Sequence, residues 1–333
     1  MGIAPVMTVL VTGAAGFIGF HVCRALLDRG EQVLGIDDLN DYYDVALKQA
    51  RRAALDGASG FSFVEGDIAR PGTVAEILQS SAEIDRVVSL AAQAGVRYSI
   101  EHPEPYVQTN VVGHLQVLEA CRHAPGLRHL VYASSSSVYG DNQKLPFSVD
   151  DPVDRPISLY AATKRAAELM SRTYAHLYGL PQTGLRFFTV YGPWGRPDMS
   201  AYIFTKAILA GEPIRVFNDG AMRRDFTFID DIVAGVLAAL DRPPAGDEEA
   251  PLPHRLYNLG NNRAEPLMDF IAAIETACGR KAEIVFDAMQ PGDVPETFAD
   301  IEASRRDLGF APKTTIAEGV PRFVAWFREY HNV

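Results

Sequence analysis

Cysteine, basic charge and long apolar runs are all scarce in this sequence. Its three cysteines, Cys23, Cys121 and Cys278, lie far apart without a CxxC pair or metal-ligand spacing, so we expect reduced, packed thiols and neither disulfides nor a metal site. Lys and Arg number 31 against 42 Asp and Glu, and the net charge of −11 opposes non-specific binding to nucleic acid or anionic lipid. No apolar run approaches the roughly 20 residues that span a bilayer. The N-terminus also lacks the basic region of a secretory signal, so these absences predict a cytoplasmic protein.

Apolar, β-rich segments alternate with helical patterns through the first half of the chain. TVLVTG, QVLGID, RVVSLAA and LRHLVYAS have the composition of buried strands, and patterns such as FIGFHVCRALLDRG and VGHLQVLEACRHA have that of helices. Parallel strands need crossover connections, and strands covered on both faces are apolar throughout. The alternation therefore predicts an α/β fold with a doubly wound parallel sheet of the Rossmann type.

The pattern changes near residue 190, where turns rich in Pro and Gly begin. For 333 residues we expect about two domains. We place a dinucleotide-binding domain at 1–189 and a smaller, mixed α/β substrate domain at 190–333, with a segment around 224–260 returning to the first. The segment 241–254 has four prolines and four acidic residues and is typical of a mobile surface loop.

A glycine-rich turn follows the first expected strand and leads into a helical pattern. Gly13, Gly16 and Gly19 would allow a tight turn and close approach of a pyrophosphate to free N–H groups at the helix N-terminus. Asp37 ends the next strand, where its carboxylate can accept both hydroxyls of an adenosine ribose and repel a 2′-phosphate. A glycine turn without a ligand is the plain alternative. The combination favours NAD over NADP.

Tyr160 and Lys164 stand four residues apart at the start of the helical pattern YAATKRAAELMSRTYAHLYG. They share one helix face, and any exposed helix could carry such a pair. After a glycine turn and a strand that ends in serines, the pair indicates chemistry: the Lys164 ammonium would lower the pKa of the Tyr160 phenol so that it acts as a base. Ser135, about 25 residues upstream, is the best candidate to share the substrate oxygen. The trio predicts hydride transfer at a carbinol carbon.

Seven motifs in order resemble one enzyme family over essentially the whole chain: GxxGxxG, LAAQAGVRYS, SSSSVYG, YAATKRAAE, LRFFTVYGPWGRPDM, RRDFTFIDDIVAG and QPGDV. The chain resembles the nucleotide-sugar epimerases and dehydratases of the extended short-chain dehydrogenase/reductase family, and among them the UDP-glucuronate 4-epimerases. The resemblance implies an isomerase that epimerises C4 of a UDP-sugar through a transient 4-keto intermediate, with NAD as cofactor and no metal. The cofactor-binding residues that it implies are Gly13, Gly16, Phe17, Ile18, Gly19, Asp37, Asn40, Asp67, Ile68, Leu90, Ala91, Ala92, Gln93, Tyr160, Lys164 and Val190.

The four serines of SSSSVYG distinguish reactions within that family. Dehydratases that the motif resembles carry an acidic pair after the catalytic hydroxyl, and decarboxylases carry a Glu just before VYG. Here those positions are Ser136 and Ser137, which disfavours both reactions. Uncharged hydroxyls suit a substrate carboxylate, since they donate hydrogen bonds without repelling it. We expect Ser134 to finish the strand and Ser136 and Ser137 to hold the C6 carboxylate, although a serine that caps the turn is the plain alternative, above all for Ser137.

Further substrate contacts are implied by the resemblance. Arg196, in the segment YGPWGRPDM, would bind the carboxylate bidentately, unless it is simply a surface arginine in a loop. Thr189 matches a small polar residue beside the sugar, and Arg224 and Asp293 match positions that bind the diphosphate and the uridine ribose. Phe217 matches the uracil site, and Arg97 is a weaker candidate near the ligand. Gln290 stands where relatives acting on neutral sugars often have Arg, which weakens a phosphate role there.

Three other functions stay open from the sequence. The chain could act on UDP-glucose and UDP-galactose, decarboxylate UDP-glucuronate, or bind NAD without catalysis. The first two differ in substrate charge and CO₂ release, and the intact Ser135, Tyr160 and Lys164 argue against the third. The apolar helical segments 105–123 and 160–178 match the four-helix dimer interface of relatives and predict a homodimer.

Overall fold

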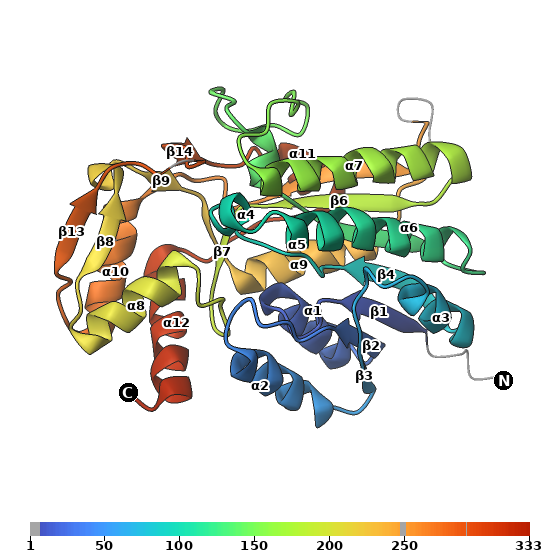
Figure 1. Cartoon of the computed structure of the whole chain (residues 1–333), viewed down its shortest axis with the longest axis horizontal. Helices are drawn as coiled ribbons and strands as arrows, with labels where there is room; N and C mark the ends of the chain where they lie inside the picture. The colour runs from blue at the N-terminus through green and yellow to red at the C-terminus, as the bar shows by residue number, and fades with distance from the viewer. Residues whose placement is uncertain (1–6, 247–250, 291) are drawn as a thin grey trace.

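The structure, a computed structural model, describes residues 7–246, 251–290 and 292–333 and is built around a seven-stranded sheet (Figure 1). All neighbouring strands in this sheet run parallel. In spatial order the strands are β11 (His254–Leu259), β6 (Gln182–Phe187), β5 (His129–Ser135), β4 (Ile84–Ser89), β1 (Thr8–Thr12), β2 (Gln32–Asp37) and β3 (Phe61–Glu65). The predicted Rossmann-type parallel sheet is confirmed.

The order of the strands creates a crevice beside β1. From β1 the chain runs outward to β2 and β3, and then returns to the other side of β1 to form β4, β5 and β6. In open parallel sheets, ligands bind at the carboxyl ends of the strands where this order reverses. The fold therefore places Gly13, after β1, and Leu90, after β4, at the expected binding crevice.

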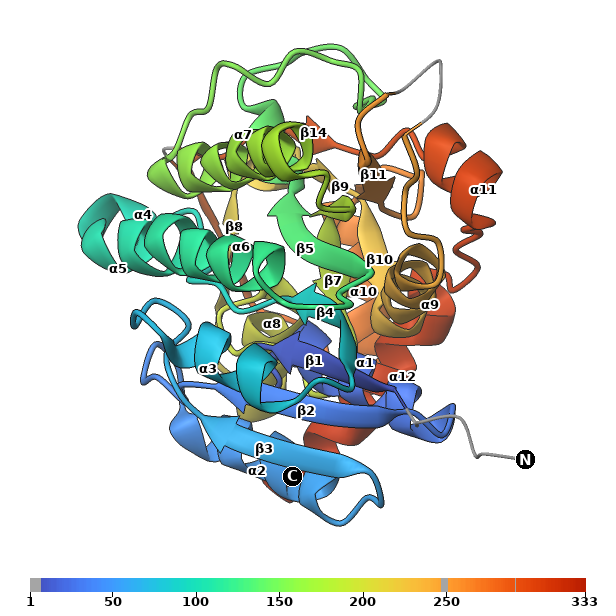
Figure 2. The same cartoon turned by 90° about the vertical axis from the view of Figure 1, so that its right-hand side faces the viewer.

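Helices cover both faces of the large sheet, as Figure 2 shows. On one side lie α1 (Phe17–Asp28), α2 (Val45–Asp56) and α9 (Ile229–Leu240), and on the other α3 (Thr73–Ser80), α4 (Tyr98–Glu101), α5 (Glu104–Val107), α6 (His114–Arg122) and α7 (Leu159–Tyr178). Because both faces are covered, the centre of β1 is apolar, with Val9, Leu10 and Val11 fully buried. None of the described helices combines the length and the apolar character needed to cross a bilayer.

The rest of the chain forms smaller sheets with their own helices. Pairs form between β7 (Thr189–Tyr191) and β10 (Phe226–Phe228) and between β8 (Ile214–Phe217) and β13 (Ile284–Asp287), and β9 (Arg223–Arg224) lies between β12 (Glu265–Pro266) and β14 (Glu296–Thr297). The accompanying helices are α8 (Ser200–Ala210), α10 (Leu267–Cys278), α11 (Glu302–Leu308) and α12 (Ile316–His331). The predicted loop at 241–254 lies partly outside the described residues, since 247–250 are among those not described.

Helix α7 begins at a defined residue, which fixes the position of Tyr160. The Ser158 side chain accepts a hydrogen bond from the Ala161 N–H and caps the helix, and Gly179 ends it in the left-handed conformation with φ of 63°. Ser at the N-cap and Gly just beyond the last turn are the residues that best satisfy free backbone groups at helix ends. Tyr160 therefore sits in the first turn of α7, beside the carboxyl ends of the strands.

A buried ion pair fastens α7 to the sheet. The guanidinium of Arg186, on β6, donates to both carboxylate oxygens of Glu168 on α7 over 2.8 and 2.9 Å, and each side chain is 1% exposed. Ser134 Oγ, on β5, donates to the same carboxylate over 2.6 Å. Such a pair is retained only with good geometry and further hydrogen bonds, because both charges lose their hydration. Here α7 is held to two adjacent strands through one carboxylate.

Removing that carboxylate's charge should destabilise the fold. We expect Glu168→Gln to lower the free energy of unfolding by about 3–5 kcal/mol at neutral pH, because Arg186 is left as a buried unpaired charge. Burial opposes ionisation of Glu168, but Arg186 holds its pKa below the ordinary 4.5. The contribution is therefore complete above pH 4.5 and is lost as pH falls through the lowered value. Urea unfolding of both proteins at several pH values measures it.

The exposed pair between Arg155 and Asp141 is the matched control. The Arg155 side chain is 80% exposed, so we expect Arg155→Gln to leave the unfolding midpoint almost unchanged. Equal effects of Arg155→Gln and Glu168→Gln would contradict the importance given to the buried pair.

Candidate active site

The glycine turn between β1 and α1 is built so that no side chain fills it. Gly13 has φ of 72°, and a Cβ there would lie 2.7 Å from the backbone nitrogen of Ala91. A Cβ at Gly19 would lie 2.0 Å from the Gly13 carbonyl oxygen. Both glycines are therefore required for the turn to close against α1 and the end of β4. The resulting cradle of bare backbone at a helix N-terminus fits the pyrophosphate of a dinucleotide.

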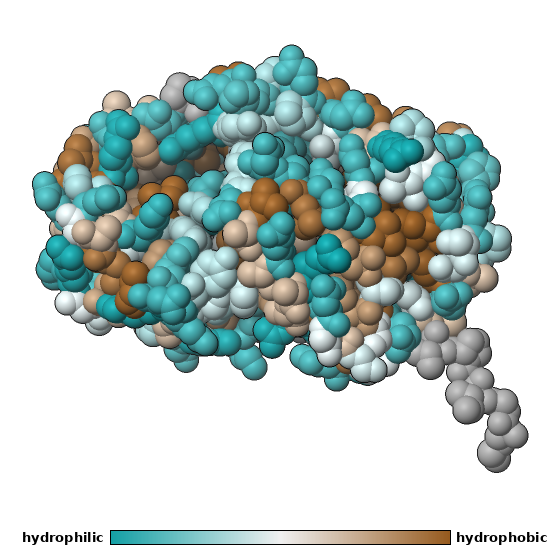
Figure 3. Space-filling model, turned by 60° about the horizontal axis from the view of Figure 1, so that its bottom comes forward, coloured by the Kyte–Doolittle hydropathy of each residue, from teal (hydrophilic) through white to brown (hydrophobic). Residues whose placement is uncertain are grey.

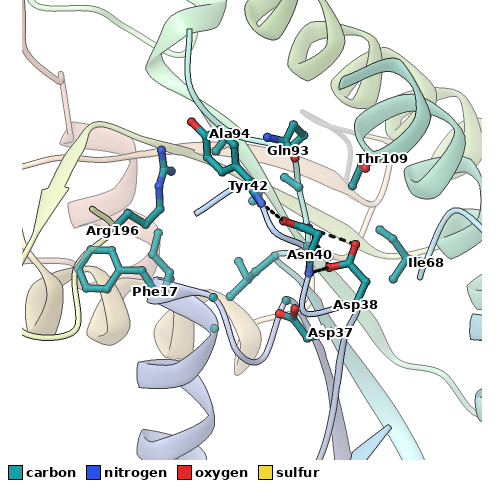
Figure 4. Close-up of a pocket in the computed structure, with 18 of the residues that line it drawn as sticks. Phe17, Asp37, Asp38, Asn40, Tyr42, Ile68, Gln93, Ala94, Thr109 and Arg196 are labelled. Atoms are coloured by element: carbon teal, nitrogen blue, oxygen red, sulfur yellow. Dashed lines mark hydrogen bonds between the residues drawn. The ribbon is translucent and has the colours of Figure 1, made fainter. Parts of the chain in front are cut away.

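Asp37 lies at the end of β2, beside that cradle, and its carboxylate is held by backbone N–H groups. Ala15 donates to one oxygen over 3.0 Å and Leu39 to the other over 2.9 Å. Burial raises the pKa of Asp37, while the Leu39 N–H and the nearby Lys48 lower it. Figure 4 shows Asp37, Asp38 and Asn40 gathered at one end of the pocket and Arg196 at the other, with Tyr42 between them.

One cavity, here called the cofactor cavity, brings together all the predicted cofactor-binding and catalytic residues. Its lining includes each of the sixteen predicted cofactor residues, from Gly13 to Val190, as well as Ser135. These residues come from the ends of β2 and β5, from the loops after β1, β2, β3 and β4, and from α1, α7 and β7. Their convergence from so many segments of the sequence fits a dinucleotide that lies across the crevice.

Ser135, Tyr160 and Lys164 all line the cofactor cavity. Lys164 Nζ donates to the Ala133 carbonyl oxygen over 3.0 Å, so the lysine is anchored to the strand that carries Ser135. The Tyr160 ring packs edge-on against Tyr106, with centroids 6.0 Å apart, and its backbone N–H donates to Ser99 Oγ. The three groups thus belong to one packed unit of β5 and α7.

Burial governs the proton affinity of these groups. It raises the pKa of Tyr160 above its ordinary 10.0, against the lowering influence of the Ser135 hydroxyl and the Arg196 guanidinium. It also lowers the pKa of Lys164 to about 8. The polypeptide by itself therefore does not give Tyr160 the lowered pKa expected from the sequence, because burial outweighs the lowering influence of Ser135 and Arg196. The influence of Lys164 on the phenol stays a prediction.

A second cavity, here called the substrate cavity, adjoins the first. It is lined by five of the predicted substrate residues: Thr189, Arg196, Phe217, Arg224 and Asp293. Arg97 also lines it: the guanidinium lies 4.4 Å from the centroid of the Phe217 ring and donates to Asp293 over 2.8 Å. Arg196, Tyr42 and Met199 line both cavities and so mark their junction.

Three predicted substrate residues lie outside the lining of both cavities: Ser136, Ser137 and Gln290. Ser136 and Ser137 begin the short 3-10 turn η2 (Ser136–Tyr139) and are half-buried. The Ser137 N–H donates to Ser135 Oγ over 3.1 Å, and the two hydroxyls lie 3.2 Å apart. Ser135 thus caps the turn, and the roles of Ser136 and Ser137 toward a carboxylate stay predictions.

Sequence reasoning missed the partners of Arg196. Its Nε and Nη2 donate to the two carboxylate oxygens of Asp198 over 2.9 and 2.5 Å, and Tyr42 Oη donates to the same carboxylate over 3.1 Å. Asp198 stands two residues after Arg196 in the motif GRPDM, and that proximity was the available signal. Tyr42 is 156 positions away from Asp198 in the sequence, and no local pattern connects Tyr42 with Asp198.

Comparisons with known proteins agree with this architecture. The pattern of the NAD-dependent epimerase/dehydratase family matches residues 9–260. The UDP-glucuronate 4-epimerase 4 of Arabidopsis thaliana is 49% identical, over 98% of this chain and 76% of that protein. The crystal structure of the Bacillus cereus UDP-glucuronic acid 4-epimerase, in complex with UDP-glucuronic acid and NAD, superposes with a TM-score of 0.89 at 35% identity, over 97% of this chain and all of that one.

A structure of an enzyme named for a neutral sugar is also similar. The UDP-glucose 4-epimerase of Thermotoga maritima, with UDP-glucose, gives a TM-score of 0.85 at 30% identity, over 98% of this chain and 100% of that chain. The fold is therefore common to enzymes named for acidic and for neutral sugars. The matched pattern covers most of the sequence, and the chain belongs to the NAD-dependent epimerase/dehydratase family.

Proposed function

We propose that this protein is an NAD-dependent isomerase that inverts C4 of a UDP-sugar and interconverts UDP-glucuronate and UDP-galacturonate. The observation that carries the proposal is the junction of the two cavities. Ser135, Tyr160 and Lys164 line one of them, and Arg196 connects it to the other, which Arg224, Phe217 and Asp293 line. This arrangement would place a sugar carbon between the catalytic trio and the nucleotide subsite.

The cofactor would lie along the cofactor cavity. The turn at Gly13, Gly16 and Gly19 would hold its pyrophosphate, and Asp37 would accept hydroxyls of the adenosine ribose. When bound, NAD⁺ supplies a reversible hydride acceptor and a positive charge that favours the tyrosinate. Inversion of C4 leaves the oxidation level of the sugar unchanged, so the reaction would have no net redox change.

The catalytic groups would move one proton. Tyr160 would accept it from the C4 hydroxyl, Ser135 would hydrogen-bond the same oxygen, and Lys164 would favour the ionised phenol. After the 4-keto sugar turns in the cavity, Tyr160 would return the proton and the opposite configuration would result. The backbone contact of Lys164 with Ala133 keeps its ammonium in position throughout.

Arg196 would contribute to recognition of the C6 carboxylate. A 4-keto uronate is a β-keto acid, which loses CO₂ when its carboxylate bond aligns with the ketone π-system. Arginine binds a carboxylate with a fixed, bidentate geometry. We infer that Arg196 and Thr189, with Ser136 and Ser137 as predicted from the sequence, prevent that alignment.

Epimerisation of UDP-glucose is the second candidate, because a specific observation favours it. Asp198 already neutralises Arg196 and occupies two of its donor atoms. A neutral sugar has no carboxylate and needs no free cation beside C6. An arginine that is already paired with Asp198 therefore suits a neutral sugar, whereas an unpaired arginine would suit an acidic one. The substrate must therefore be tested with both sugars.

Assembly and location are also proposed. Exposed apolar side chains on α4 to α7 suit a homodimer interface: Ile100, Val107, Leu115, Leu169, Leu177 and Tyr178. Figure 3 shows apolar surface on the half of the molecule where Figure 1 places α5 and α6. Free buried cysteines support a reducing, cytoplasmic location. We retain 1–189 and 190–333 as the NAD-binding and UDP-sugar-binding domains, with 224–260 returning to the first, because α9 packs against α1 and β11 against β6.

The first test is incubation of the purified protein with UDP-glucuronate without added reductant. We expect UDP-galacturonate to form without external reductant, because the hydride would leave and return within the site. We expect no CO₂, because the C6 carboxylate would be held out of alignment with the C4 ketone. NMR of the sugar protons and a CO₂ assay measure both. A UDP-pentose with CO₂ would show a decarboxylase instead, and conversion of UDP-glucose alone would favour the neutral-sugar candidate.

Removal of the phenol tests the role of Tyr160. We expect Tyr160→Phe to lower kcat by about 10²-fold or more, the usual effect of losing a general base. NAD content after purification should stay near that of the wild type, because Asp37 and the glycine turn are unchanged. Tyr330→Phe, on α12 and outside both cavity linings, is the control and should leave kcat unchanged. A kcat of Tyr160→Phe close to the wild-type value would exclude the assigned role.

Light scattering tests the dimer. We expect Leu169→Lys with Leu177→Lys to halve the molar mass, because the charges would face the partner helices. Val285→Lys, at an exposed apolar position on β13, should leave the mass unchanged. A wild-type monomer, or a double variant that stays dimeric, would contradict the interface.

A further inference from the structure

Asp198 occupies the side of Arg196 that a ligand carboxylate would use. The two side chains form two parallel hydrogen bonds, from Nε to Oδ1 and from Nη2 to Oδ2, over 2.9 and 2.5 Å. This is the bidentate geometry in which arginine recognises a carboxylate. A carboxylate of this chain therefore already stands where a bound carboxylate is expected.

The pair is accessible from the cavities and is not part of the core. The side chains of Arg196 and Asp198 are 22% and 30% exposed, Arg196 lines both cavities, and Asp198 lines the substrate cavity. A ligand in the substrate cavity can therefore reach the guanidinium. As long as Asp198 holds it, however, the pair presents no net charge to that ligand.

Asp198 has a second partner that does not depend on Arg196. Tyr42 Oη donates to its Oδ2, and Tyr42 is itself packed against Gly95 and Tyr98, which line the substrate cavity. Its hydroxyl lies 2.5 Å from where a Cβ on Gly95 would be, and its ring packs on Tyr98 with centroids 4.8 Å apart. If Arg196 turned to another carboxylate, Asp198 would keep a donor and partial hydration, which avoids a buried, unpaired charge.

The charges of the pair also reach the catalytic base with opposite signs. Besides the dominant effect of burial, Arg196 lowers the pKa of Tyr160 and Asp198 raises it. Asp198 therefore offsets part of the influence of Arg196 at the reaction centre as well as in the substrate cavity. A change in the partner of Arg196 would therefore alter the electrostatic potential both at Tyr160 and in the substrate cavity.

We propose that Asp198 is an internal carboxylate that competes with the substrate carboxylate for Arg196 and so sets the preference between acidic and neutral UDP-sugars. The proposal rests on the proposed function and goes beyond it, because it gives a specificity-determining role to a residue that contributes no attraction of its own. To bind Arg196, the carboxylate of an acidic sugar must displace Asp198. A neutral sugar leaves the pair intact.

The test is Asp198→Asn, which removes the charge but keeps the shape and an oxygen for Tyr42. Dissociation constants for UDP-glucuronate and UDP-glucose are measured by calorimetry in the Tyr160→Phe background, so that neither ligand is turned over. We expect UDP-glucuronate to bind at least about fivefold more tightly, the effect of removing one like charge from a hydrated site. UDP-glucose should bind as before.

Two controls isolate the pair. Asp141→Asn removes the same charge from an exposed carboxylate that pairs with Arg155 and should change neither affinity. In an Arg196→Gln background, Asp198→Asn should lose most of its effect on UDP-glucuronate, because no guanidinium remains to be released. A large effect that persists there would show simple charge repulsion and would overturn the competition.

Other outcomes are equally decisive. Weaker binding of UDP-glucuronate in Asp198→Asn would show that Asp198 positions Arg196 for the ligand, and an equal change for both sugars or none would show no role in specificity. Each of these overturns the proposal. The proposed function is judged separately, from turnover of UDP-glucuronate by the wild type, so the two ideas can fail independently.

Discussion

The catalytic geometry depends on the carboxylate of Glu168. It accepts hydrogen bonds from Arg186 on β6 and from Ser134 on β5, and it lies on the helix that carries Tyr160 and Lys164. Ser134 immediately precedes Ser135. The position of Tyr160, the proposed base, relative to the Ser135 hydroxyl is therefore set by this buried polar network. The same hydrogen bonds stabilise the packing of the helix on the sheet.

The charges that line the substrate cavity, and not the net charge of the chain, favour the binding of an anion there. The chain is acidic overall, with a net charge of −11, yet four arginines line the substrate cavity. Arg97 pairs with Asp293 and Arg196 with Asp198, while burial lowers the pKa of Arg224. Cations held by carboxylates of the same chain avoid the cost of isolated charges. Under the proposed competition, a ligand carboxylate would have to exchange with Asp198 for Arg196, which favours selectivity over simple attraction.

Local chemistry in the sequence predicted much of the fold and the cofactor site. The glycine turn, Asp37 and the pair Tyr160 and Lys164 are short-range patterns, because backbone conformation and helix periodicity fix them within a few residues. The contact of Asp198 with Tyr42 and that of Glu168 with Arg186 could not be read in this way. Tyr42 reaches Asp198, and Arg186 reaches Glu168, only because separate elements pack together. The balance that raises the Tyr160 pKa likewise depends on burial, which no motif records.

The rigidity of the unit formed by β5 and α7 assigns the motion to the sugar. Lys164 is anchored to Ala133, Tyr160 packs on Tyr106, and Glu168 ties the helix to the strands. An inversion requires that two opposite faces of one carbon meet the same hydride donor. With these side chains held in place in the proposed reaction, the ring would have to turn about its bonds to the diphosphate while the nucleotide stays in place. The nucleotide would then be the fixed end about which the sugar rotates, and the proposed contacts of Phe217, Arg224 and Asp293 would hold it in place.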